Sequence, residues 1–156
     1  MDTSITRGAA GPVPADGYHD AVPDERAVRV VIADDTDSVR DLVCLLLDLE
    51  PDFTVVGQAR NGAEAVDVVA EAHPDLVLLD VVMPVLDGIS ALPRVRAAAP
   101  GARVVVFTGS IEGSMEREVV ALGADALVDK GLVNGPFVAR LREVCHRPPR
   151  PIAASV

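Results

Sequence analysis

The sequence predicts a doubly wound α/β fold in which helices cover both faces of a five-stranded parallel sheet. Short β-branched apolar runs alternate along the chain with longer segments of helical periodicity. The runs are apolar on both faces, which is typical of strands that are covered on both sides in a parallel sheet. These two observations together indicate buried strands that alternate with helices along the chain.

Strand and helix follow one another five times. The predicted strands are Val28 to Ala33, Thr54 to Val56, Leu76 to Leu79, Arg103 to Phe107 and Ala126 to Val128. The predicted helices are Ser38 to Leu49, Ala63 to Ala72, Gly88 to Ala98, Ser114 to Leu122 and Asn134 to Cys145. In the first helix, valine and leucine side chains form one stripe at helical spacing. Stop signals follow the first four helices at Pro51, Pro74, Pro100 and Gly123.

One folded domain is expected, at residues 28–146, because a chain of 156 residues fits a single domain. Residues 1–27 carry scattered glycine, proline and charged residues without apolar periodicity, so we expect a disordered N-terminal arm. Residues 147–156 begin with Arg147-Pro148-Pro149-Arg150-Pro151, which cannot continue a helix. They are expected to form a Pro-rich C-terminal tail.

The chain has a formal net charge of -10, which disfavours binding to nucleic acid or to an anionic membrane. Its longest apolar run, Leu42 to Leu47, is far shorter than the ~20 residues of a membrane span. Two distant cysteines, Cys44 and Cys145, suit neither a disulfide framework nor a zinc site, so a reducing cytoplasm is the expected location. The arginines around the third helix, Arg94, Arg96 and Arg103, are interpreted as solvated surface charges.

Polar residues follow four of the five predicted strands. They are Asp34-Asp35, Asp80, Thr108 and Asp129-Lys130. Each of them alone is most often a helix cap, a turn residue or a surface charge. Together they would meet at the carboxyl edge of a parallel sheet, where ligands bind in this class of fold. Clustered carboxylates repel one another, and hard oxygen ligands without histidine or thiolate suit Mg²⁺.

These residues, in this order, resemble the receiver domain of two-component response regulators over residues 28–146. The resemblance rests on Asp34-Asp35, Asp80, Met83-Pro84, Asp87-Gly88, Thr108-Gly109, Gly123-Ala124 and Lys130. The stretches at residues 28–35, 61–66 and 87–92 look most like receivers of the NarL/FixJ type. The resemblance implies a flavodoxin-like sheet with strand order 2-1-3-4-5.

The resemblance also implies a role for each site residue. Asp80 would accept a phosphoryl group from the phosphohistidine of a sensor histidine kinase. Mg²⁺ would be held by Asp34, Asp35, Asp80 and the backbone carbonyl of Val82, with Asp34 acting mainly through a water. Lys130 and Thr108 would contact the phosphoryl oxygens. Val82 cannot orient a water through its side chain, so slow loss of the phosphoryl group is expected. The resemblance also implies that the chain is a signalling domain rather than an enzyme.

Phosphorylation is expected to shift the surface made by the fourth helix, the fifth strand and the fifth helix between two states, and a homodimer would form through this same surface. Family members commonly have an aromatic residue three positions before the lysine, and its ring turns inward on activation. This chain has Leu127 there, so it lacks the aromatic ring that would signal the change. NarL-type regulators of transcription usually continue into a DNA-binding domain, which needs tens of residues more than this chain has. The output partner is either another protein or a domain missing from this chain.

Two alternatives stay open at the level of sequence. One is an interaction module with the receiver fold that acts without phosphorylation, which Leu127 would favour. The other is a phosphatase similar to the haloacid dehalogenases, because Asp35-Thr36-Asp37-Ser38 follows an apolar strand. That second reading leaves Asp80 unexplained and lacks the later acidic pair which such enzymes need.

Overall fold

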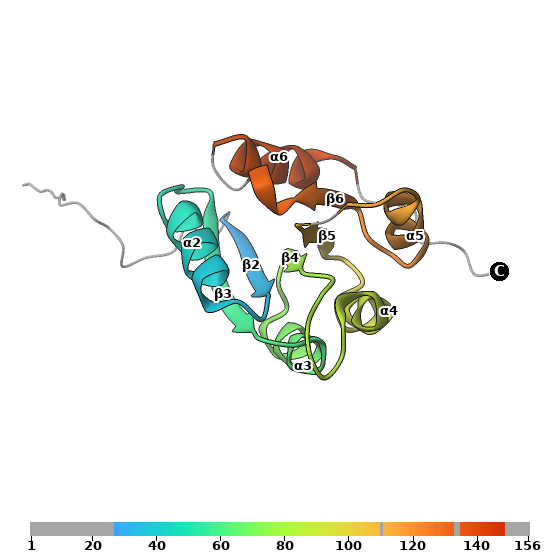
Figure 1. Cartoon of the computed structure of the whole chain (residues 1–156). Helices are drawn as coiled ribbons and strands as arrows, with labels where there is room; N and C mark the ends of the chain where they lie inside the picture. Colours follow the sequence, from blue (N-terminus) through green and yellow to red (C-terminus); the bar gives the residue numbers. More distant parts are fainter. Residues whose placement is uncertain (1–26, 110, 133–134, 149–156) are drawn as a thin grey trace, which may run out of the picture.

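The computed structural model describes residues 27–109, 111–132 and 135–148, and its strands form one five-stranded sheet (Figure 1). The strands are β2 (Val28–Ala33), β3 (Phe53–Ala59), β4 (Leu76–Leu79), β5 (Arg103–Thr108) and β6 (Ala126–Asp129). Their order across the sheet is β3-β2-β4-β5-β6, and all neighbours are parallel. Counted along the chain, this is the order 2-1-3-4-5, which confirms the predicted fold. Nearly all of the predicted arm and tail lies outside the described residues.

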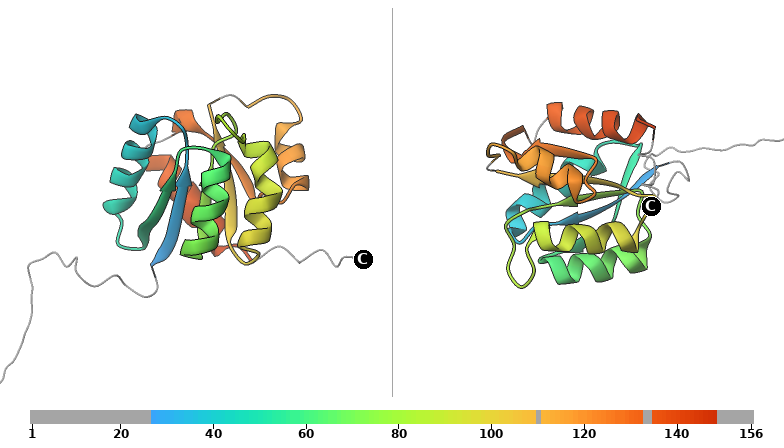
Figure 2. Two further views of the ribbon diagram at one scale, coloured as in Figure 1. Left: turned by 90° about the horizontal axis from the view of Figure 1, so that it is seen from below. Right: turned by 90° about the vertical axis from the view of Figure 1, so that its right-hand side faces the viewer.

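Five α-helices cover the two faces of the sheet (Figures 1 and 2). They are α2 (Asp37–Asp48), α3 (Gly62–Ala72), α4 (Gly88–Ala98), α5 (Met115–Ala121) and α6 (Gly135–His146), and a short 3-10 turn, η4 (Lys130–Leu132), follows β6. One apolar core joins the sheet to α3, α4 and α5, and a second core joins the other face to α2 and α6. Among the described residues, none of these helices has the length and apolar content that a bilayer crossing requires.

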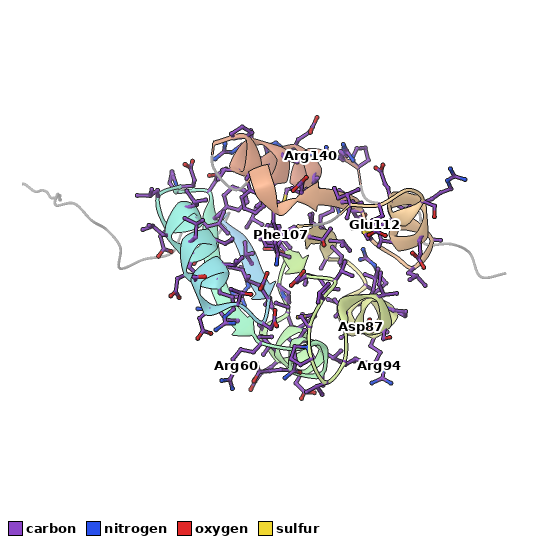
Figure 3. The ribbon with its side chains drawn as sticks, in the orientation of Figure 1. Arg60, Asp87, Arg94, Phe107, Glu112 and Arg140 are labelled. Atoms are coloured by element: carbon purple, nitrogen blue, oxygen red, sulfur yellow. The ribbon has the colours of Figure 1, made fainter. Side chains whose placement is uncertain are left out.

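The two cores account for the alternation of side chains along the strands. In β2, Val31 and Ala33 face the α3 side, and Val30 and Ile32 face the α2 side. Phe107 in β5 packs on Phe137 of α6 with ring centroids 5.3 Å apart. Figure 3 shows Phe107 in the interior, whereas Arg60 and Arg94 project outward. Burial on both faces is therefore what selects the continuous apolar runs in the sequence.

Two interpretations of surface charge are wrong. Arg96 donates from Nε and Nη2 to the carbonyl of Gly123, and its Nη2 lies 2.8 Å from Asp125 Oδ2. Arg103 donates to the carbonyl of Val144 in α6. Only Arg94 is exposed as expected. Buried carbonyls at the ends of elements need donors, and a guanidinium can reach several of them at once.

Candidate functional site

The polar residues predicted from the sequence stand at the carboxyl edge of the sheet. Asp34 directly follows β2, and Asp80 directly follows β4. Thr108 is the last residue of β5, and Lys130 directly follows β6. Asp34, Asp80 and Thr108 are at most 3% exposed, whereas Asp35 is exposed. Because all strands are parallel, their carboxyl ends bring residues from four separate segments to one place.

Three carboxylates and one ammonium group are in direct reach of one another. One oxygen from each of Asp34, Asp35 and Asp80 can be chosen so that the three lie within 4.8 Å of one another. Lys130 Nζ lies 2.6 Å from Asp34 Oδ2 and 3.0 Å from Asp80 Oδ2. With all four groups ionised, three negative charges against one positive charge leave the cluster at net -2.

Burial and charge shift the acid-base behaviour of this cluster. Burial, and then the neighbouring charge of Asp34, raise the pKa of Asp80 above its ordinary value, although Lys130 opposes the shift. For Lys130, partial burial lowers the pKa, but the hydrogen bonds and the negative charges of Asp34 and Asp80 together outweigh burial, so its pKa is raised. Lys130 is therefore positively charged at neutral pH, whereas the ionised form of Asp80 is destabilised by burial and by the charge of Asp34.

The donor set of this cluster fits Mg²⁺. The three side chains offer only hard carboxylate oxygens, and no histidine or cysteine belongs to the group. Mg²⁺ prefers such oxygens and keeps several waters. The exposed Asp35 leaves one side of the cluster open to these waters and to an incoming anion. Asp34, Asp35 and Asp80 could therefore hold the ion.

The loop after Asp80 is pinned against the site by two close backbone approaches. Gly88 donates from its N–H to the carbonyl of Val81, and a Cβ at Gly88 would lie 1.9 Å from the carbonyl oxygen of Asp80. Gly62 donates to the carbonyl of Leu86, and a Cβ there would lie 2.1 Å from that oxygen. Only glycine allows such contacts. Val82, in this loop, is 70% exposed, and its N–H reaches Asp80 Oδ1 at 3.4 Å.

Thr108 is followed by a glycine whose Cβ position is not crowded by the described residues. A Cβ at Gly109 would meet nothing nearer than the Lys130 side chain, at 3.9 Å. Thr108 itself is buried, at the end of β5 and opposite Asp129 of β6. Leu127, which stands where an aromatic residue was expected, pairs with Val106 and is half-buried.

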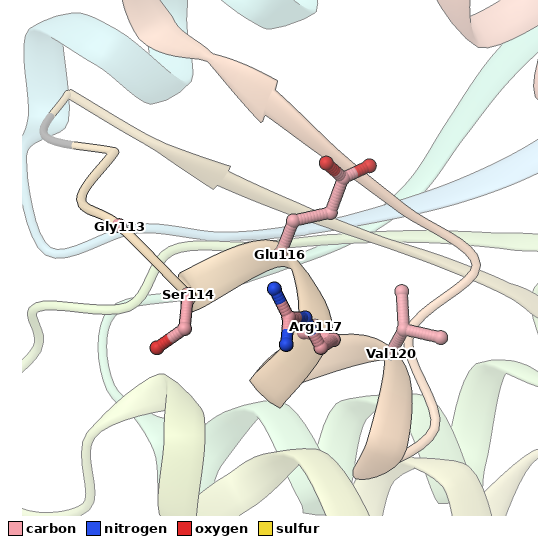
Figure 4. A pocket seen from close by; sticks show the side chains of 5 residues that line it. All are labelled: Gly113, Ser114, Glu116, Arg117 and Val120. Carbon is pink, nitrogen blue, oxygen red and sulfur yellow. The ribbon is translucent and has the colours of Figure 1, made fainter.

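A separate hollow of about 340 Å³ lies at α5 (Figure 4). Its lining residues are Gly113, Ser114, Glu116, Arg117 and Val120. None of them belongs to the acidic cluster, so the chemistry of the chain is not centred there.

Sequence reasoning missed one residue that touches the cluster. Arg40 in α2 is 8% exposed and donates to the carbonyl of Asp34. Arg40, Val43 and Leu47 share the buried face of this helix. An arginine at a core-facing position of an apolar stripe was the signal that could have found it.

Comparison with known families decides what this site belongs to. A family model described as the response regulator receiver domain matches residues 30–142. The chain belongs to this receiver family. The match includes every carboxylate of the cluster as well as Thr108 and Lys130.

Individual receivers resemble the chain to different extents. It is 35% identical to the chemotaxis protein CheY of Halobacterium salinarum over 104 residues, 67% of this chain and 85% of that protein. It is 39% identical over 99 residues to a protein-glutamate methylesterase/protein-glutamine glutaminase of Nocardioides sp., covering 64% of this chain and only 27% of that relative. The chain thus spans about a quarter of that relative's length.

Solved structures of receivers are similar too. The receiver domain of a putative NarL from Mycobacterium tuberculosis has a TM-score of 0.70 and 30% identity, with 78% of this chain and 99% of that chain covered. CheY6 from R. sphaeroides, solved in complex with the P1 domain of CheA3, has a TM-score of 0.64 and 31% identity, with 76% and 95% covered. Because these relatives include chemotaxis and NarL receivers, they do not single out the NarL/FixJ type.

Proposed function

We propose that this receiver accepts a phosphoryl group on Asp80 from a sensor histidine kinase in the cytoplasm, in a Mg²⁺-dependent reaction. The observation that carries the proposal is the convergence of three carboxylates, with oxygens of Asp34, Asp35 and Asp80 within 4.8 Å of one another, and of the Lys130 ammonium, which contacts Asp34 and Asp80. A domain that gathered three carboxylates for structure alone would gain nothing from their mutual repulsion.

The residues divide the chemistry between them. An oxygen of Asp80 attacks the phosphorus as the bond to the donor imidazole nitrogen breaks, and the nitrogen keeps that electron pair. Asp35, Asp80 and the Val82 carbonyl would hold a bound Mg²⁺, with Asp34 acting mainly through a water, and the charge of the ion would offset repulsion between the carboxylates and the incoming phosphoryl oxygens. Lys130 turns from Asp80 to a phosphoryl oxygen, and the Thr108 hydroxyl donates to another.

The output follows from the same movement. Drawing Thr108 toward the phosphoryl group shifts the segment after β5 and biases the surface of α5, β6 and α6 between two states. Aliphatic repacking of Leu127 against Val106 takes the place of an aromatic switch. A second protein, a homodimer partner or an output domain of NarL/FixJ type would read this surface, with transcription as the regulated process in the last case.

A phosphorylation-independent interaction module is the second candidate, and Leu127 favours it. It gives no reason for a buried Asp80 paired with Lys130. A phosphatase of the haloacid dehalogenase type is weaker still, because its nucleophile would be Asp35, which leaves the buried Asp80 and its ion pair with Lys130 without a role.

The deciding experiment is incubation with acetyl phosphate and Mg²⁺ followed by intact mass. Wild type should gain one phosphoryl group, and Asp80→Asn should gain none. Asp87→Asn is the control: it removes a carboxylate of the same loop that does not belong to the cluster, so this variant should still react. No gain in wild type would favour the phosphorylation-independent module, and steady release of phosphate with Asp80→Asn still active would favour the phosphatase.

The same sample gives the lifetime of the phosphorylated form. Because the side chain of Val82 has no polar group that could orient a water, we expect hydrolysis over minutes or longer after acetyl phosphate is removed. Decay within seconds, without any phosphatase present, would contradict this part of the proposal.

A further inference from the structure

Among the described residues, four polar side chains belong to residues that are buried: those of Asp34, Arg40, Asp80 and Thr108. Three of them form the candidate site, and the fourth, Arg40, has no part in the chemistry proposed above. Burying a guanidinium is costly unless it is paired and hydrogen-bonded. The position of Arg40 therefore calls for an explanation in terms of its contacts.

The contacts of Arg40 bracket the turn that carries the acidic pair. Its Nη1 donates to the carbonyl oxygen of Asp34 at 2.5 Å, and its Nη2 forms an ion pair with Asp37 Oδ1. The Asp37 side chain is 81% exposed, so its carboxylate loses little hydration free energy when it pairs with Arg40. One rigid guanidinium thus links the end of β2 to the start of α2.

The accepting carbonyl belongs to the peptide unit that joins Asp34 to Asp35. Its orientation sets the direction in which the chain leaves Asp34 and hence where the Asp35 side chain begins. The Asp34 side is already held, because its N–H donates to Ala59 and its Oδ1 accepts from the Thr36 N–H at 2.8 Å. Asp35 is exposed, so burial in the core does not fix the position of its side chain. The Arg40 bond supplies the missing constraint.

We propose that Arg40 is a positioning residue for the metal cluster, holding the Asp34–Asp35 peptide so that Asp35 stays within ligand reach of Asp34 and Asp80. The proposal rests on the proposed function. An apolar residue at the same point of the stripe formed with Val43 and Leu47 would pack equally well but could not hold this carbonyl.

Two variants separate positioning from charge. Arg40→Met removes the charge and both bonds, whereas Arg40→Lys keeps the charge but loses the planar fork that reaches two acceptors. A nearby positive charge opposes Mg²⁺ binding, so a purely electrostatic role predicts tighter binding by Arg40→Met and no change in Arg40→Lys. A positioning role predicts weaker binding by both. Arg142→Met is the matched control, since Arg142 ties α6 to Glu50 and Asp52 away from the cluster.

The dissociation constant for Mg²⁺ is measured by titration calorimetry at constant ionic strength, with urea unfolding as the check on folding. We expect both Arg40 variants to bind Mg²⁺ at least fivefold more weakly than wild type, and Arg142→Met to bind as wild type does. Unchanged or tighter binding by Arg40→Lys overturns the inference, even if Arg40→Met fails to fold. Absence of Mg²⁺ binding by folded wild type would instead sink the proposed function, and the inference with it.

Discussion

The side chain of Asp80 is ionised at an electrostatic cost that the fold itself imposes. Burial and the charge of Asp34 raise its pKa above the ordinary 3.8, and the nearby Lys130 offsets only part of the cost. The folded state therefore holds the Asp80 proton more strongly than the unfolded chain does. As pH rises from 3.8 through the raised pKa, this group lowers the free energy of unfolding.

This sign leads to a prediction for Asp80→Asn. Without Mg²⁺ at pH 7, the variant should be more stable than wild type by on the order of 1 kcal/mol, because it no longer carries the buried charge. The gain should shrink as pH falls from the raised pKa to 3.8, and it should be lost below 3.8, where Asp80 of wild type is protonated in the folded and the unfolded state. Urea unfolding across pH measures it, with the exposed Asp48→Asn as control. A gain that does not vary with pH would point to packing rather than to charge.

At this scale the sequence predicted which charged side chains meet at the edge of the sheet, but not the contacts that support them. Asp34, Asp80 and Lys130 are brought together because each follows a strand of one parallel sheet, a pattern that a linear reading can detect. Arg40 and Arg96 were missed or misread, because the carbonyls that they contact belong to residues whose proximity depends on the turn geometry and on tertiary packing.

The elements themselves were predicted closely where apolar periodicity is strong. Val28–Ala33, Leu76–Leu79 and Gly88–Ala98 have the predicted limits. The edge strand β3 is longer than the predicted strand at residues 54–56. The prediction stopped early because Gly57 and the exposed Gln58 interrupt the apolar pattern. Its pairing with β2 also shifts register between Val30 and Val31. The backbone of β3 still pairs with β2 at Gly57 and Gln58, although the sequence is not apolar at these positions.

The loop between β4 and α4 gives an element-scale prediction. Gly88→Ala places a methyl group against the carbonyl of Asp80, so the loop must move. We expect a loss of stability of about 1–3 kcal/mol, typical of overpacking, together with slower phosphorylation by acetyl phosphate. Gly101→Ala is the matched control, because nothing lies within 4 Å of its Cβ. Equal stability of the two variants in urea would show that the loop yields freely and does not position the site.

For the molecule as a whole, strand order was beyond any local pattern. Periodicity distinguishes strand from helix, but it does not say that β2 stands between β3 and β4. The resemblance to receivers supplied the order, which depends on how the helical crossovers divide between the two faces. The two apolar cores record that division, with α2 and α6 on one side and α3, α4 and α5 on the other.

The net charge of -10 means that any salt can stabilise the whole molecule, so a specific effect of Mg²⁺ must be separated from screening. At equal ionic strength, MgCl₂ at ten times its Kd should stabilise wild type over NaCl by about 1.4 kcal/mol, because the ion binds the folded cluster and not the unfolded chain. Thermal unfolding measures the difference. Asp80→Asn should lose most of it, whereas Glu118→Gln, which removes one exposed carboxylate of α5, should keep it. Equal stabilisation of all three proteins would mean that Mg²⁺ acts on the overall charge and not on the cluster.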